Sequence, residues 1–249
     1  MSRFKWQRLV AYAVQEKVDL FVTYGIQRSI YGNDVLEQSQ RKSAQEVLDK
    51  KRRLYTRFEN RPKPLTQFSN IALRLKMNRI FNEEVHKMDT QMPMLALLDL
   101  IANFLKEAFL GRLSYDALIK IGLYLRQQGH RVDFNTLDEY IDKLRLGKTA
   151  NLIGTILVNV FDFSKEEIQF LKEEDKDYMK VIEHYFSLSL NDFTTQRQKK
   201  HSGTNLTLGI HDHSRISAQR GKYYARYHRQ EAFSSYFSNL IKSITQVEE

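Results

Sequence analysis

Histidine and carboxylate side chains that could bind a metal ion gather in one stretch of the sequence. His211 and His213 flank Asp212, and His201 and His228 lie in the same region. Imidazole and carboxylate groups are ligands that zinc and other transition metals accept. The stretch is rich in glycine and serine, whereas metal ligands usually project from rigid elements. We therefore expect a polar loop with no metal and no other cofactor, and we keep His211 and His213 as the alternative ligands.

Positive charge forms the second chemical feature. The range 197–229 carries eight basic residues against one acid, and so holds most of the net charge of +9. Lysine and arginine neutralise phosphates, so such a cluster is typical of proteins that bind nucleic acids or other polyanions. The candidate binding residues are Arg197, Lys199, Lys200, Arg215, Arg220, Lys222, Arg226 and Arg229.

Tyrosines are interleaved with the last of these cations, and tyrosine rings can stack on nucleic-acid bases. On a helix, however, Tyr224 and Tyr227 are three residues apart, which favours packing into a core beside Phe233. The neighbouring cations, Arg226 among them, would then lie on the solvated side of that helix. The acidic run 166–177 is expected to neutralise the chain's own basic region.

Catalytic patterns are otherwise scarce. The chain has no cysteine, which excludes disulfides, thiolate metal sites and a cysteine nucleophile. His86 follows Glu83 and Glu84 and precedes Asp89 on one predicted helix, which offers an acid–base pair, but we expect these residues to be structural. No serine lies in a nucleophile-elbow pattern. An enzyme with an unrecognised or metal-assisted site is the third alternative, after a binding protein and a nucleic-acid-binding protein.

The composition predicts the elements that must position these groups. Of 249 residues, 42% are hydrophobic and 28% charged, with three prolines and ten glycines. So few turn-forming residues favour long helices, and we predict an all-α, multi-helix bundle of about eight to ten helices. The expected units are a bundle at 1–190, a basic polar connector at 191–222 and a C-terminal helix at 223–249 that packs back on the bundle. We see no signal peptide and no membrane span, and expect a cytoplasmic protein.

Local signals place several helix ends. Pro93 begins a helix that is apolar on nearly all sides, which predicts burial. Asp133 is a predicted N-cap, and Ser164 with Glu167 forms a capping box for a helix ending near Phe170. Gly129 is the predicted left-handed residue after a helix, and Gly147 is predicted to separate two helices. The predicted helices run over 4–29, 34–58, about 66–88, 93–109, 113–126, 134–144, 150–161, 178–188 and 223–247.

The segment 93–163 resembles the C-terminal helical half of an uncharacterised bacterial nucleotidyltransferase family common in Bacteroidetes. The matching stretches are an apolar helix, a Gly-initiated helix, a short polar joint, a Leu-rich helix ending in Gly and a closing apolar helix. They correspond to Leu95–Phe109, Gly111–Arg126, Arg131–Asp133, Leu137–Gly147 and Ala150–Phe163. The opening residues Trp6, Leu9, Ala13, Val18, Gly25 and Ile26 are similar to that family's first helices.

The family's chemistry departs from this sequence at the active site. Nucleotidyl transfer there needs a Gly-Ser turn followed by Asp-x-Asp on a strand, because Mg²⁺ requires oxygen ligands. This chain has Ser202-Gly203-Thr204 and, elsewhere, Asp175-Lys176-Asp177 in a charged run, so both order and spacing differ. The resemblance therefore implies a helical scaffold without its catalytic core. We expect a non-catalytic binding or scaffold protein with a protein partner; the alternative is a nucleic-acid-binding accessory protein that uses the basic C-terminal region. The oligomeric state is not predicted.

Overall fold

The structure is a computed structural model that describes residues 63–87, 92–110, 113–186 and 223–245, together with Ala13, Val18, Asp19, Phe21, Val22 and Gly25. Within these residues there are seven α-helices, two short 3₁₀ helices and no strand. The all-α prediction is thus confirmed for the described part of the chain. The count of eight to ten helices for the whole chain stays a prediction, and the connector predicted at 191–222 lies outside the described residues.

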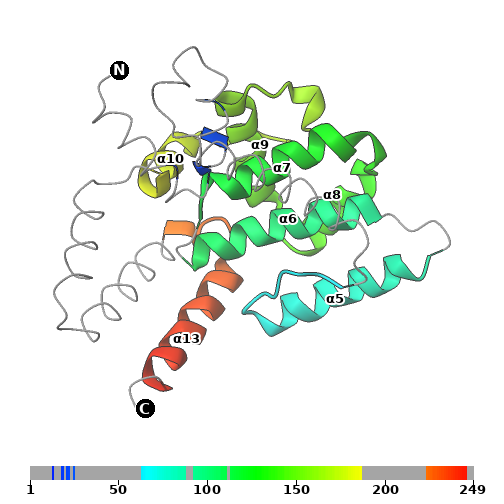
Figure 1. The fold of residues 1–249 in the computed structure, drawn as a ribbon. Coiled ribbons are helices and arrows are strands. Elements are labelled where there is room, and N and C mark those ends of the chain that lie inside the picture. The colour runs from blue at the N-terminus through cyan, green and yellow to red at the C-terminus, as the bar shows by residue number, and fades with distance from the viewer. Residues whose placement is uncertain are drawn as a thin grey trace, which may run out of the picture.

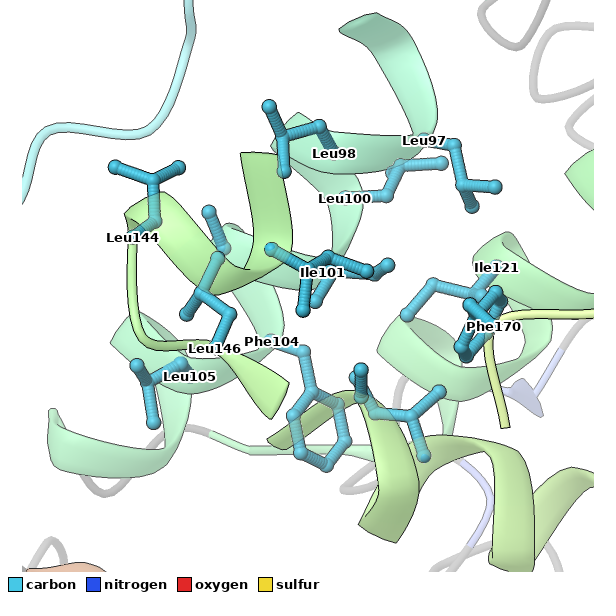
Figure 2. Packing of buried hydrophobic residues seen from close by; sticks show 14 of the residues in the cluster. Leu97, Leu98, Leu100, Ile101, Phe104, Leu105, Ile121, Leu144, Leu146 and Phe170 are labelled. Atoms are coloured by element: carbon cyan, nitrogen blue, oxygen red, sulfur yellow. The ribbon is translucent and has the colours of Figure 1, made fainter. Parts of the chain in front are cut away.

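Helix α6 (Met92–Phe109) is the centre of the fold and is buried on nearly every side. In Figure 1, α7 and α9 lie above it and α5 and α13 lie below it. Figure 2 shows Ile101 and Phe104 of α6 among Ile121, Leu146 and Phe170 from three other segments. A helix that is apolar all round needs such a surround to remove it from water. The burial predicted from its sequence is therefore confirmed.

The helices that cover α6 on one side are α7 (Tyr115–Gln128), α8 (Phe134–Lys143) and α9 (Gly147–Phe161). The Asp133 carboxylate accepts hydrogen bonds from the N–H groups of Asn135 and Thr136, which confirms the predicted N-cap. The Thr136 hydroxyl also donates a hydrogen bond to the Asp133 carboxylate, at 2.6 Å. This bond most strongly, and the two N–H bonds with it, hold the pKa of Asp133 below its usual range.

Helix ends occur at both predicted glycines, but neither glycine has the role that we predicted. Gly129 is right-handed (φ −56°) because α7 passes directly into the 3₁₀ helix η2 (Gly129–Arg131), where Val132 N–H bonds to the Gly129 carbonyl. Gly147 is the first residue of α9, and the chain reverses two residues earlier at Arg145, whose φ is 57°. In each case the backbone bonds of the neighbouring residues, rather than the glycine, fix the helix end.

After α9 the chain folds back across that helix. Ser164 and Glu167 form the predicted capping box, but the helix that they begin, η3 (Lys165–Glu167), is a single 3₁₀ turn that ends well before Phe170. Ile168 and Phe170 are buried against the bundle, and α10 (Tyr178–Phe186) follows. Gly154 of α9 makes this crossing possible, since a Cβ there would lie 3.0 Å from both Ile168 Cγ2 and Leu171 Cβ.

Helices α5 (Ile71–Val85) and α13 (Arg229–Thr245) complete the described fold. The segment before α5 is fixed to α6 by the buried Asp99, whose carboxylate accepts hydrogen bonds from Leu65 N–H and Thr66 N–H, both at 2.9 Å. Helix α13 begins later than predicted, because the chain turns at 225–227 before it becomes helical again.

We predict that Gly154→Ala lowers the free energy of unfolding by about 1–2 kcal/mol. Alanine normally stabilises a helix interior by about 1 kcal/mol relative to glycine, but here the added methyl overpacks the contact with Ile168 and Leu171. The control is Gly129→Ala, where the new Cβ meets no atom within 4 Å and should be neutral or slightly stabilising. Denaturant unfolding of both variants measures this; equal effects would contradict the close approach.

Candidate functional site

Helix α13 is attached to the fold by a buried carboxylate. Glu231 is 1% exposed, and its carboxylate accepts hydrogen bonds from Ser69 N–H at 2.6 Å and Asn70 N–H at 2.9 Å. These N–H groups lie at the N-terminus of α5, where unpaired donors and the helix dipole favour an anion. Burial raises the pKa of Glu231, and the two backbone bonds oppose that rise. One side chain thus joins two helices whose residues are 160 or more positions apart.

Further polar contacts fix the same side of α13. The Asn70 amide donates to the Ser234 hydroxyl at 3.0 Å. His228 is buried at the start of the helix; its Nδ1 accepts from Glu231 N–H at 3.2 Å, and its Nε2 lies 3.0 Å from the Leu144 carbonyl oxygen. A ring whose Nδ1 accepts must donate from Nε2, which defines a neutral tautomer. Over residues 229–238, whose side chains the structure describes, the side of α13 that faces the protein is therefore mainly polar.

The opposite side of α13 is aromatic and exposed. Phe233, Tyr236 and Phe237 are 67%, 51% and 45% exposed, and we call these three residues the aromatic face. Their rings contact one another, with centroids 4.7 Å apart for Phe233 and Phe237 and 5.9 Å for Tyr236 and Phe237. Large exposed apolar groups in contact mark binding surfaces more often than isolated ones. The aromatic face is our candidate functional site.

Sequence reasoning located these aromatic residues incorrectly. Tyr224 and Tyr227 are buried, as predicted, but the prediction that Phe233 packs beside them is wrong. The turn at 225–227 breaks the helical register, so the spacing that relates Tyr224 to Tyr227 does not extend to Phe233. Burial of Glu231 then turns Phe233 outward, since residues two apart on a helix lie on different sides.

Two of the eight predicted basic residues are described. Arg226 is half-buried: it pairs with Asp177 at 2.8 Å, donates to the Tyr227 hydroxyl at 2.7 Å and stacks over the Tyr223 ring. Arg229 is exposed at the start of α13. The expected neutralisation of the acidic run by the basic region is thus seen in one ion pair. The other six candidates lie outside the described residues: Arg197, Lys199, Lys200, Arg215, Arg220 and Lys222.

Arg226 also lines a shallow cavity of about 250 Å³ with Lys148, Asn151, Tyr227 and the segment 173–177. Three of its four acids are engaged: Glu174 pairs with Lys165, and the Asp175 carboxylate accepts a hydrogen bond from Asp177 N–H. Asp177 bonds to Lys180 and Arg226, and these cations, Lys180 foremost, lower its pKa. The cavity therefore carries mixed, internally paired charge rather than a set of free ligands.

The metal candidates His211 and His213 lie outside the described residues, as does His201. In the part of the chain that the structure describes, no group of three or more His, Cys, Asp or Glu side chains could hold a metal ion. Both ring nitrogens of His228 contact main-chain groups, which occupies the positions a metal would need.

A buried polar group lies at the end of α5, and sequence reasoning did not predict its burial. Glu84 is fully buried; Tyr140 donates a hydrogen bond to its Oε1, Lys87 forms an ion pair with the same oxygen, and Oε2 has no partner. Of the other residues considered with it from the sequence, Glu83 and His86 are exposed, and Asp89 lies outside the described residues. The signal was present in the spacing, because Glu84 follows Met77 and Ile80 on the buried side of α5. Burial and the bond to Glu84 raise the pKa of Tyr140 to about 12.

The part of the chain that the structure describes is thus an all-helical fold that displays the aromatic face of α13. No protein-family model, curated protein or solved structure matches the chain. None of the described helices is both long and apolar enough to cross a membrane.

We predict that Tyr140→Phe lowers the free energy of unfolding at neutral pH by about 1–3 kcal/mol, because Glu84 loses a hydrogen bond while buried. A raised tyrosine pKa stabilises the folded state fully below pH 10, and this contribution is lost as pH rises through about 12. The difference in free energy of unfolding between the parent and Tyr140→Phe should therefore shrink above pH 10.

Chemical denaturation at several pH values between neutral and alkaline measures this difference. The control is Tyr236→Phe, which removes an exposed hydroxyl and should leave stability unchanged at every pH. A deficit for Tyr140→Phe that stays constant above pH 10 would show that the hydroxyl is not shielded from ionisation.

Proposed function

We propose that the chain is a non-catalytic helical binding or scaffold protein whose aromatic face contacts a protein partner. One observation carries this proposal: α13 is fixed by its polar side and leaves its aromatic side in water. Its likeness to the helical half of the nucleotidyltransferase family remains a proposal based on sequence pattern. A bacterial source, a cytoplasmic location and eight to ten helices in the whole chain are proposals of the same kind.

The energetics of the aromatic face support binding. Large aromatic side chains bury about 150–250 Å² each, at roughly 25 cal/mol per Å². Covering the exposed half of three such rings would gain on the order of 5 kcal/mol before the costs of association. Tyrosine and phenylalanine are also enriched in protein interfaces. Helix α13 is held by hydrogen bonds of Glu231 and Ser234, which do not involve the aromatic face. We therefore expect α13 to keep its position when no partner is bound.

Support for the non-catalytic part comes from the groups that could do chemistry. Asp177 is paired with cations, His228 contacts main-chain groups through both ring nitrogens, and Glu231 caps a helix. Each of these side chains is engaged in holding the fold. Transfer of a labelled nucleotide to any acceptor in the presence of Mg²⁺ would overturn this part of the proposal.

The alternative, a nucleic-acid-binding accessory protein that uses the basic C-terminal region, has less support. Arg226 would have to leave Asp177 and Tyr227 to reach a phosphate. Of the two candidates that the structure describes, only Arg229 is exposed, and one cation supplies little affinity, because binding strength grows with the number of phosphates neutralised. The other six candidates lie outside the described residues and stay untested.

We predict that Phe233→Ser with Phe237→Ser abolishes partner binding and lowers the free energy of unfolding by no more than about 1 kcal/mol, since the two side chains are 67% and 45% exposed. Affinity purification of the tagged full-length chain from cells that naturally make it, compared by mass spectrometry, measures the partner. Thermal unfolding measures stability.

The matched control is Val160→Ser with Met179→Ser, which removes two apolar side chains of 45% and 46% exposure on α9 and α10. Partners that are lost with the α13 variant must be retained with this control. If both variants retain the same partners, the aromatic face is not the binding surface.

We predict that Arg226→Met lowers the free energy of unfolding by about 1 kcal/mol through loss of the Asp177 pair and the tyrosine stacking. Arg229→Met, at an exposed position, should change it by less than about 0.5 kcal/mol. A gel shift of single-stranded DNA at low salt should be the same for both variants and the parent. A shift that Arg226→Met weakens, with stability unchanged, would favour the nucleic-acid alternative.

A further inference from the structure

We propose that the partner is an acidic amphipathic helix whose apolar side packs on α13 and on the first turns of α5. This rests on the proposed function above and specifies the chemistry of the partner. The surface combines the aromatic face with Ile71 and Leu75, and we call these five residues the junction face.

The two apolar sets of the junction face lie on helices that are joined by hydrogen bonds at their first turns. Ile71 and Leu75 are 63% and 62% exposed on α5, on the side opposite the buried stripe of that helix. The Asn70 amide donates a hydrogen bond to the Ser234 hydroxyl at 3.0 Å. Ile71 is the residue after Asn70, and Phe233 is the residue before Ser234. Figure 1 shows α5 and α13 close together at this point and diverging from it. The apolar sets therefore begin on either side of one contact.

Charge around the junction face is positive. The range 63–82 contains Lys63, Arg74, Lys76 and Arg79, all exposed, and no acidic residue. On α13, Arg229 is exposed, and the one acid between 229 and 238, Glu231, is buried beneath the surface as the cap of α5. The first exposed acid along α5 is Glu83. A partner with carboxylates beside its apolar residues would complement this pattern.

The same charges argue against a second copy of this chain. A symmetric dimer brings a surface against itself, so Arg74, Arg79 and Arg229 would meet an equally basic surface across the interface. Like charges placed together disfavour association.

The aliphatic side chains of Ile71 and Leu75 also offer no ring on which a nucleic-acid base could stack.

The spacing of the apolar residues favours a helical partner. Ile71 with Leu75, and Phe233 with Phe237, are each four residues apart and form ridges along their helices. Such ridges accept the matching row of another helix, which presents anchors at i, i+3, i+4 and i+7. An interfacial membrane helix inserts its apolar side about 5–10 Å into the lipid. The side chains of the junction face are only 45–67% exposed, because the protein covers their bases. They are therefore better suited to packing against another protein than to insertion into a membrane.

The test uses the purified full-length chain and designed fluorescent peptides of about 20 residues, long enough for five helical turns. One peptide carries leucine at i, i+3, i+4 and i+7 with glutamate elsewhere; its counterpart replaces every glutamate by lysine. Fluorescence anisotropy should show at least about tenfold tighter binding of the acidic peptide, weakened by high salt. Phe233→Ser with Phe237→Ser should remove this binding.

Charge reversal tests the electrostatic part. Arg74→Glu with Arg79→Glu should lose the acidic peptide and gain the lysine peptide, because the flanks of the junction face change sign. The matched control, Arg131→Glu with Lys143→Glu on η2 and α8, changes net charge equally and should keep the preference for the acidic peptide.

Other outcomes overturn the inference in distinguishable ways. Equal binding of both peptides, or binding only of phosphatidylglycerol vesicles, single-stranded DNA or a second copy detected by ultracentrifugation, would reject the acidic helix. If equal binding of both peptides, or self-association, still depends on Phe233 and Phe237, the proposed protein-binding function stands. Binding only of vesicles or single-stranded DNA through these residues would reject that function as well. If no probe binds through these residues and affinity purification recovers no dependent partner, both proposals fail.

Discussion

The bond between the Glu231 carboxylate and the N-terminus of α5 determines the arrangement of the described helices below α6. A buried carboxylate is stable only where donors replace its lost hydration, and Ser69 and Asn70 supply two N–H groups. The segment before α5 is thereby held at both ends, by Asp99 of α6 at its start and Glu231 of α13 at its finish. The position of α5 therefore depends on two acids from two different helices.

The parts of the fold that sequence predicts well are those set by local chemistry. The burial of α6 follows from an apolar helix without a polar side, and the caps at Asp133 and Ser164 follow from bonds that span two or three residues. Helices do end near Gly129 and Gly147, but neither glycine reverses the chain as predicted, because glycine permits a reversal without requiring one. At Arg145, surrounding backbone bonds impose a left-handed residue where no glycine occurs.

The candidate site was beyond local prediction for a related reason. An amphipathic helix such as α13 is expected to bury its apolar side, and this expectation placed Phe233 in the core. It fails because the target of Glu231 lies 160 or more residues away, so nothing near α13 in the sequence signals that its polar side is the attached one. Glu84 differs, since its position in the buried stripe of α5 was readable from spacing alone.

The Glu231 contact also makes the two ends of the described chain one cooperative unit. Proteins open locally in segments that share their stabilising contacts, and amide hydrogen exchange reports such openings. Fraying of the first turn of α5 would release the Glu231 carboxylate, and detachment of α13 would leave Ser69 and Asn70 N–H groups without acceptors. The hydrogen-exchange protection of the Ser69 and Asn70 amides therefore reports whether α13 is bound to the N-terminus of α5. Any ligand that holds α13 in place also slows their exchange, although it touches neither amide.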